Sequence, residues 1–214
     1  MLKINLDNTL PRVFLRRDDI RSDVWRQPVT LEKGKTYLVE ASSGTGKSSL
    51  LSFIIGYRKD FEGNILFDGR NSRELSTSDW TTLRQSHISM LFQELRLFPE
   101  LTAMENIEIK NSLTRFKTRE EVGEWFDALG IADKMHSPVR LMSFGQQQRV
   151  AMIRALVQPF DFLLADEPVS HLDDANSAAM AHIMMDEARR QGAGIIITSI
   201  GKHMQIPYDK TLRL

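Results

Sequence analysis

The sequence predicts an α/β fold: a core built on a parallel β-sheet, with an antiparallel β edge and an inserted α-helical subdomain. β-Branched strand segments alternate with helical segments, which is the order of a parallel sheet. Glu62–Gly69 is a short strand between turn residues, typical of an antiparallel edge. From Leu95 to Leu141 apolar residues recur at helical spacing. We expect one domain, 1–214, with a core formed by 1–94 and 142–214 and a helical subdomain formed by 95–141.

The composition excludes several classes of protein. At 214 residues and 42% hydrophobic content, the chain can bury a sizeable core. Its 28 basic and 28 acidic residues give a formal charge of zero, which offers no overall attraction to nucleic acid. The absence of cysteine excludes disulfides and thiolate chemistry. The first residues lack the apolar core of a signal peptide, and no stretch approaches a membrane span, so we expect a soluble chain.

The strand Thr36–Glu40 leads into a glycine-rich loop and then into the helical run Ser49–Ile55. The order strand, loop and helix is that of a P-loop, G-x-x-x-x-G-K-[ST], with Ala41 at the first glycine position. In such a loop, backbone N–H groups bind the β-phosphate, the lysine reaches the β- and γ-phosphates, and the hydroxyl after it binds Mg²⁺. Without this context, the loop would be a Gly/Ser-rich turn with an exposed lysine. The predicted nucleotide-binding residues are Ser42, Ser43, Gly44, Thr45, Gly46, Lys47, Ser48 and Ser49, with Lys47 also catalytic and Ser48 a metal ligand.

A second strand, Phe160–Ala165, ends in two acids, Asp166 and Glu167. The carboxyl ends of parallel strands face the crevice where ligands bind, so these acids are expected beside the P-loop. Asp166 would hold Mg²⁺ through water, and Glu167 would orient or deprotonate an attacking water. In isolation, the same pair would simply close a strand before Pro168.

The segment Met142–Arg149 predicts a helix N-terminus, because Ser143 and Gln146 have the spacing of a capping box. A capped helix start with free N–H groups is an anion site, although the segment would also fit a plain amphipathic helix. The segment resembles the signature sequence of ABC-transporter ATPases, L-S-G-G-Q, with Phe144 in place of a glycine. The resemblance implies a homodimer in head-to-tail ATP-sandwich form, in which Ser143, Gly145 and Gln146 contact ATP held by the second subunit.

Other positions of the chain are similar to that family in the same order. Gln93, after the strand Ile88–Phe92, matches the Q-loop glutamine, which implies a catalytic and Mg²⁺-sensing role. Ser170–Asp173 matches the D-loop, which communicates across the dimer. The resemblance also implies that an integral membrane subunit docks at Leu97, Phe98 and Pro99.

Two positions leave alternatives open. Phe14 lies where the family has an aromatic residue against adenine, but it could equally belong to the core, and Trp25 is the other aromatic candidate. Ser199 follows the strand Gly194–Thr198, where the family has a histidine that contacts the γ-phosphate, so hydrolysis could be slow. His203 could fill that role, although an ordinary surface histidine is the more frequent case.

The sequence thus predicts an ATP-binding and ATP-hydrolysing subunit, with ATP and Mg²⁺, of an ABC-type membrane transport or mechanotransmission complex. It resembles the lipoprotein-release, macrolide-export and cell-division group, which implies a cytoplasmic protein, peripheral on the inner face of the cell membrane through its membrane partner. The alternative is a nucleotide-operated dimerisation or signalling module with little hydrolysis, because Ala41, Phe144 and Ser199 all depart from the family pattern. DNA-associated ABC ATPases need a long coiled-coil insertion that this sequence lacks, so no nucleic-acid partner is expected.

Overall fold

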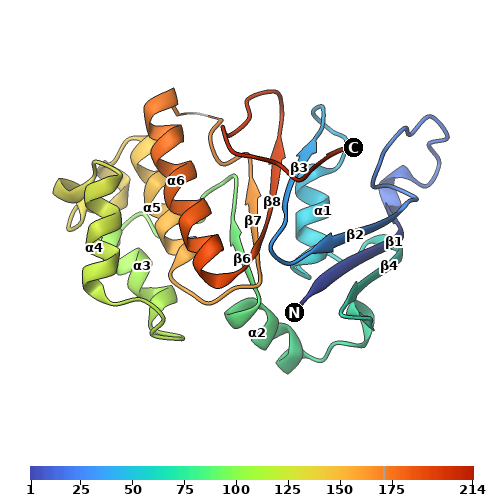
Figure 1. Cartoon of the computed structure of the whole chain (residues 1–214), viewed down its shortest axis with the longest axis horizontal. Coiled ribbons are helices and arrows are strands. Elements are labelled where there is room, and N and C mark those ends of the chain that lie inside the picture. Colours follow the sequence, from blue (N-terminus) through green and yellow to red (C-terminus); the bar gives the residue numbers. More distant parts are fainter. Residues whose placement is uncertain (171) are drawn as a thin grey trace.

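The computed structural model describes residues 1–170 and 172–214, and it contains two β-sheets (Figure 1). The central sheet has five parallel strands in the order β6-β7-β8-β3-β9. Parallel neighbours require crossover connections, which the helices provide. The strands are β3 (Thr36–Glu40), β6 (Ile88–Leu91), β7 (Phe162–Asp166), β8 (Gly194–Ser199) and β9 (Lys210–Arg213).

The sequence predicts β3, β6, β7 and β8, although β7 begins two residues later than expected, but it does not predict β9. The carboxylate of Asp161 accepts from the amine of Met1 (2.6 Å) and from Lys33, and it contacts the His87 ring. These bonds hold Asp161 in the connection that precedes the strand. The pKa of Asp161 is lowered because these three hydrogen-bond donors outweigh its partial burial.

The second sheet is antiparallel, in the order β2-β1-β4-β5. The antiparallel edge predicted at Glu62–Gly69 is present, and it forms part of a separate sheet in which β4 pairs with β1. Buried residues alternate with exposed ones along β2, so this sheet has one apolar face that must be covered. Its strands are β1 (Lys3–Pro11), β2 (Pro28–Glu32), β4 (Phe61–Phe67) and β5 (Arg70–Asn71).

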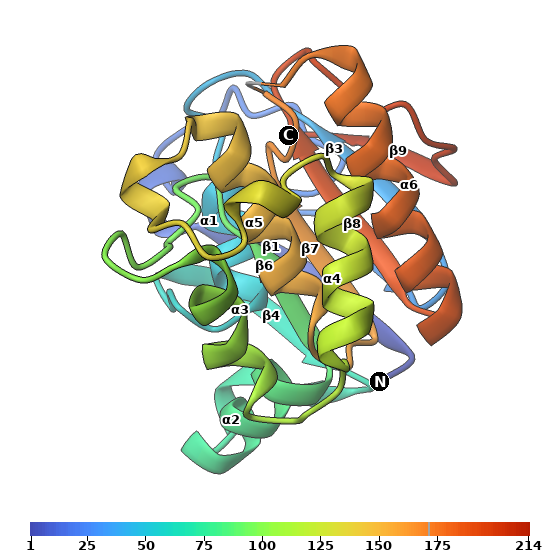
Figure 2. The same cartoon turned by 90° about the vertical axis from the view of Figure 1, so that its left-hand side faces the viewer.

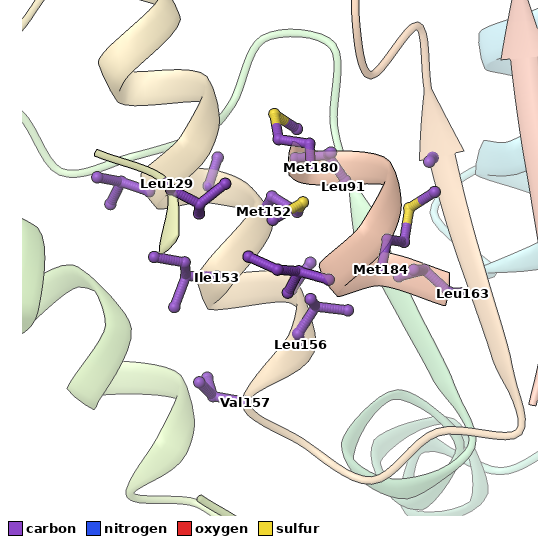
Figure 3. Close-up of a cluster of buried hydrophobic side chains, with 14 of the residues drawn as sticks. Leu91, Leu129, Met152, Ile153, Leu156, Val157, Leu163, Met180 and Met184 are labelled. Atoms are coloured by element: carbon purple, nitrogen blue, oxygen red, sulfur yellow. The ribbon is translucent and has the colours of Figure 1, made fainter. Parts of the chain in front are cut away.

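Within the described residues, two apolar clusters that include helices lie on the two faces of the central sheet. Leu163 of β7 packs in one apolar cluster with helices α3 to α6 (Figure 3). Its neighbours Phe162 and Leu164 point the other way, into a cluster with α1 and the antiparallel sheet. The helices are α1 (Lys47–Ile54), α2 (Thr77–Ser86), α3 (Ala103–Asn111), α4 (Arg119–Ala128), α5 (Phe144–Leu156) and α6 (Asp174–Gln191), with short 3₁₀ turns η1 (Arg12–Phe14), η2 (Ser72–Glu74), η3 (Ala132–Lys134) and η4 (Val139–Leu141).

The segment 95–141 is helical, as the sequence predicts, and Figure 2 looks onto its helices α3 and α4. The capping boxes that open these helices, Thr102 with Glu105 and Thr118 with Glu121, are both formed. Ile107 and Phe126 pack in the same apolar cluster as Ile153 of α5. The domain boundaries at 94/95 and 141/142 remain a prediction. Among the described helices, none has both the length and the apolar character needed to cross a membrane.

Candidate functional site

The loop between β3 and α1 is held in shape by glycine. Gly46 is the N-cap of α1 and has a φ of 101°, in the left-handed region. A Cβ on Gly46 would lie 3.0 Å from Cζ2 of Trp25 and 3.2 Å from Cε2 of Phe14. Gly44 has a φ of 81° and no atom near its Cβ position, so only its conformation requires glycine. Larger residues at Gly46 are therefore excluded by both conformation and space.

The N-terminus of α1 has free hydrogen-bond donors and a buried cation. Among residues 1–170 and 172–214, no side chain caps this helix start, and no acidic residue stands in its first turn. Lys47 is 6% exposed, and its Nζ donates to the Ser42 carbonyl at 3.3 Å and lies 3.6 Å from Oε1 of Glu167. Uncapped N–H groups beside a lysine form an anion site that suits phosphate. The Ser49 hydroxyl, by contrast, accepts from Arg58 at 2.8 Å.

The two predicted acids lie at the carboxyl end of β7, beside β8. Asp166 is buried, and one of its carboxylate oxygens accepts from the hydroxyl of Thr198. The backbone N–H of Glu167 donates to the Thr198 carbonyl at 3.1 Å, and Glu167 has a φ of 50°. A left-handed glutamate stores strain of about 1 to 3 kcal/mol, which is often found at active sites. Thr198 was not among the predicted site residues, although its position near the end of the neighbouring strand β8 could have indicated a role at this site.

A magnesium site at this edge fits the residues that are present. No group of three or more His, Asp or Glu among residues 1–170 and 172–214 could hold a metal ion by itself. Magnesium is typically bound through one or two protein oxygen ligands together with substrate phosphates. Asp166, at the end of β7, and Ser48, in the first turn of α1, supply a carboxylate and a hydroxyl of the required kind.

Gln93 follows one strand of the central sheet, and Ser199 is the last residue of another. Gln93 is exposed and lies two residues after β6, which pairs with β7. Ser199 is 3% exposed, and its hydroxyl donates to the Lys202 carbonyl at 2.6 Å. The Ser199 carbonyl accepts from the N–H of Ala41, the first residue of the loop, at 3.2 Å. Ser199 thus holds a turn and meets the start of the P-loop.

His203 lies on the other side of the same turn. Its Nε2 is 3.2 Å from Oε1 of Glu40, and it lines a hollow of about 300 Å³ with Ala41 and Ser42. Its Nδ1 is buried and has no hydrogen-bond partner among the described residues. His203 is therefore close to the loop, which an ordinary surface histidine would not be.

Phe14 and Trp25, the two aromatic candidates, lie together beside the loop. Both belong to the apolar cluster around α1, and both line a hollow of about 230 Å³ with Thr45 and Arg17. The guanidinium carbon of Arg17 lies 5.4 Å from the centre of the Phe14 ring. Trp25 is 2% exposed, and its indole N–H donates to the Thr45 carbonyl at 2.9 Å. Trp25 therefore faces the loop backbone, while Phe14 fits both alternatives.

The predicted signature segment opens α5. The Ser143 hydroxyl accepts from the N–H of Gln146 at 3.3 Å, and the Gln146 side chain accepts from the N–H of Ser143 at 2.9 Å, so the predicted capping box is formed. Ser143 is exposed, and a Cβ on Gly145 would lie 3.2 Å from Leu172. Within the described residues, no hydrogen bond or ion pair joins Ser143, Gly145 or Gln146 to the P-loop. In the described part of the chain, the predicted signature segment is therefore not bonded to the P-loop of the same chain.

The segment before α6 is tied to the signature helix. Asp173 caps α6 through the N–H of Asn176 at 2.8 Å, and Arg149 of α5 donates to the Asn176 side chain. Hydrogen bonds from the backbone and side chain of Asn176 lower the pKa of Asp173. His171, in the predicted D-loop, lies outside the described residues.

The three residues predicted to dock on a partner are not buried. Phe98 is 52% exposed, Leu97 is half-buried and Pro99 is exposed. The buried Asn106 fixes the backbone of Phe98 by accepting from its N–H at 2.7 Å and donating to its carbonyl at 3.0 Å. The result is an exposed apolar segment on a fixed backbone.

Comparisons with known proteins concern the family of this chain. Residues 27–170 match the family described as "ABC transporter". An uncharacterized ABC transporter ATP-binding protein of Bacillus subtilis, YclH, is 32% identical over 87% of this chain and 83% of its own length. The lipoprotein-releasing system ATP-binding protein LolD of Novosphingobium aromaticivorans is 31% identical over 86% of this chain and 84% of its own length.

Two further comparisons concern length and fold. The macrolide export ATP-binding/permease protein MacB of Rhodopseudomonas palustris is 33% identical over 80% of this chain, which spans 26% of that protein. The dimeric structure of MJ0796, a bacterial ABC transporter cassette, has a TM-score of 0.77 and 25% identity, and the match covers 92% of this chain and 87% of that one. The chain therefore belongs to the ABC transporter family, as an ATP-binding subunit.

Proposed function

We propose that this chain binds Mg·ATP at its P-loop and hydrolyses it with Glu167, as the ATPase of a membrane complex. The observation that carries this proposal is the buried Lys47 at the uncapped start of α1, 3.6 Å from Glu167. A cation and free N–H groups would bind the phosphates. A carboxylate at the same point would act on the water that attacks the γ-phosphate.

Each remaining residue at this edge has a proposed role. Ser48 and Asp166 would hold Mg²⁺, whose charge offsets that of the phosphates. Thr198 orients Asp166 by donating to one carboxylate oxygen, which leaves the other free. Gln93, after β6, would contact Mg²⁺ and the attacking water. Phe14 lies beside the loop, where it would contact the adenine ring.

The complete site is proposed to need two copies of the chain. Ser143, Gly145 and Gln146 would contact the ATP held by the P-loop of the second copy. Ser143 is exposed at the start of α5, Gly145 and Gln146 are half-buried, and within the described residues none of the three bonds to the P-loop of its own chain, which supports a head-to-tail homodimer. The structural neighbour with a TM-score of 0.77 is itself described as dimeric.

A membrane subunit is proposed to dock at Leu97, Phe98 and Pro99, because an exposed apolar segment on a fixed backbone suits a partner helix. The chain would then lie at the inner face of the cell membrane. Relatives named for lipoprotein release and macrolide export support work of this kind. Replacing Phe98 with Asp should uncouple ATPase activity from the membrane subunit and leave the basal rate unchanged. A coupled rate that survives this change would contradict the docking site.

A second candidate function is a dimerisation module with little hydrolysis. It is favoured by Ser199, whose hydroxyl already donates to the Lys202 carbonyl and which lacks the charge of a histidine. In that case, ATP would still join two chains, but turnover would be slow.

The experiment that tests the main proposal is Glu167→Gln, followed by size-exclusion chromatography with and without Mg·ATP. Loss of the base should lower the rate by about 10²- to 10⁴-fold and trap an ATP-bound dimer. Glu124→Gln, the same change at an exposed position on α4, is the matched control. A variant that stays monomeric at saturating ATP and hydrolyses normally would overturn both the base and the dimer. If the unchanged protein dimerises with ATP yet barely turns over, the second candidate is correct.

A further inference from the structure

Trp25 lies under the P-loop and contacts it in two ways. Its indole N–H donates to the Thr45 carbonyl at 2.9 Å. Its ring lies against Gly46, because a Cβ there would be 3.0 Å from Cζ2 and 3.5 Å from Cε2 of the indole. At 2% exposure, the ring has no free face on which a nucleotide base could stack. We infer that Trp25 is a positioning residue that sets the shape of the P-loop for its phosphate.

The backbone that carries Trp25 is itself fixed to the central sheet. The Ser22 hydroxyl accepts from the N–H of Trp25 at 2.9 Å and donates to the Arg213 carbonyl at 3.2 Å. The N–H of Asp23 donates to the same carbonyl at 2.7 Å. Arg213 ends β9, which pairs with β3, the strand that enters the loop. The loop is thus held at its entry by β3 and at its middle by Trp25, and Trp25 is tied through Ser22 to β9 of the same sheet.

The hydrogen bond from Trp25 has a clear effect on the loop. The Thr45 carbonyl is engaged by the indole, while the Thr45 hydroxyl donates to the Ser42 carbonyl at 2.9 Å. These two bonds fix both ends of the Thr45 residue just before the left-handed Gly46. The backbone N–H groups that follow are therefore held ready for phosphate before it arrives. Such preorganisation raises affinity because the loop loses less freedom on binding.

This inference rests on the proposed binding of Mg·ATP, and it predicts a particular kinetic pattern. Trp25→Phe keeps an aromatic ring but removes the N–H donor. Loss of one such hydrogen bond should weaken nucleotide binding by about three- to tenfold. The turnover number at saturating ATP should change much less, because Glu167 and Asp166 lie on a different strand. A general loss of folding would instead lower both quantities.

The decisive measurement is made on the unaltered protein and does not depend on its ATPase activity. Variants serve only to assign the signals. The chain has three tryptophans, so a ¹⁵N-correlated NMR spectrum shows three indole N–H signals. Trp25→Phe and Trp125→Phe assign them, and the third belongs to Trp80. We expect the Trp25 signal alone to shift and saturate as Mg·ATP is added. Its N–H should also exchange with solvent more slowly in the presence of the nucleotide.

The outcomes separate this inference from the proposed function. Binding by calorimetry together with a shifted Trp25 signal supports the inference. Binding with an unchanged Trp25 signal, or a Trp25→Phe variant of unchanged affinity, overturns it and leaves the proposed function intact. Absence of any calorimetric binding of Mg·ATP overturns the proposed function, and the inference that rests on it falls too. Trp125→Phe, a change on α4, should leave the affinity as it is.

Discussion

Helices α1 and α5 begin at the two predicted phosphate-binding motifs of this chain, yet their N-termini are built in opposite ways. The start of α1 has no side-chain cap, and a buried lysine lies beside it. The start of α5 is closed by the reciprocal bonds of Ser143 and Gln146, and Phe144 beside it is 45% exposed. Helix α1 leaves the N–H donors at its start without a side-chain cap. Helix α5 satisfies two of the N–H donors at its own start within the chain.

This difference between the two helix starts predicts an order of assembly. An uncapped helix start with a cation gains most from an anion, so the loop before α1 should bind nucleotide first. The capped start of α5 is stable without a ligand and gains only what further N–H groups can add. The signature segment is thus suited to join a site that the other chain has already loaded.

The largest effect should come from mixing two inactive variants. Lys47→Ala removes the cation at α1, and Ser143→Arg blocks the start of α5, so each variant alone should lose nearly all ATPase activity. A mixed dimer has one site made from the intact half of each chain. An equal mixture should therefore recover about a quarter of the normal rate, as expected for a head-to-tail pair with composite sites. The ATPase rate against the mixing ratio is the measurement.

A mixture that stays inactive would contradict the composite site, provided that Ser143→Arg still binds ATP. Calorimetry on each single variant checks this condition. Ser143→Ala is the milder companion, since it removes the cap without adding bulk. It should cost about 1 kcal/mol of folding stability and leave nucleotide binding to the P-loop unchanged.

The next effect concerns the far end of α5. Lys110 donates to the Ser89 hydroxyl at 2.9 Å, and Ser89 in turn donates to the Ala155 carbonyl near the end of α5. No carboxylate among the described residues lies within ion-pair distance of Lys110, and burial, with Arg154 nearby, lowers its pKa from 10.5 to about 7. Folding therefore disfavours the proton on this amine.

The contribution of Lys110 to folding stability depends on pH. Between about pH 7 and pH 10 the unfolded chain holds a proton that the folded chain releases, so the contribution of Lys110 to stability rises with pH. Below about pH 7 both states are protonated and the full penalty applies. Lys110→Met should raise the free energy of unfolding at pH 7 by about 2 to 4 kcal/mol and flatten its rise towards pH 10. Urea unfolding at several pH values measures both the free energy of unfolding and its rise with pH. If Lys110→Met leaves the slope of stability against pH unchanged, Lys110 is excluded as the source of that slope.

The smallest effect should come from Ser199→His. A histidine at the end of β8 could donate to charge that develops on the phosphate, but it must break the bond to the Lys202 carbonyl. We expect the rate to rise by less than about tenfold and the affinity for ATP to stay constant. Steady-state kinetics at several ATP concentrations separate a change in the hydrolysis rate from a change in the affinity for ATP. If Ser199→His has no effect while His203→Ala abolishes turnover, His203 already fills the role.

The ends of β3, β6, β7 and β8 could be predicted well from the sequence. The strands in the first 30 residues could not. The strand before the P-loop, β3, is buried along all but its last residue, which is the pattern of a strand covered on both faces. Strand β2 and the first half of β1 alternate more and less buried residues, and the two strands include Asn5, Asp7 and Pro28, so their character depends on pairing across the sheet.

The predicted site shows the same limit. The P-loop and the capping box of α5 depend on neighbours in the sequence, so local patterns were sufficient for both. The hydrogen bond of Thr198 to Asp166 and that of Trp25 to Thr45 join distant segments. No local pattern contains such contacts, and only the strand order brings their residues together.

The position of β3 in the sheet also bears on synthesis. Strand β3 is made early, but both of its partners, β8 and β9, are the last strands of the chain. A nascent chain that has left the ribosome only as far as α5 can form the antiparallel sheet, but its loop strand has no neighbour. Pairings between distant segments form slowly and expose apolar surface meanwhile. The nucleotide site should therefore mature only after β8 and β9 have been synthesised, and ATP should protect only chains that include both strands.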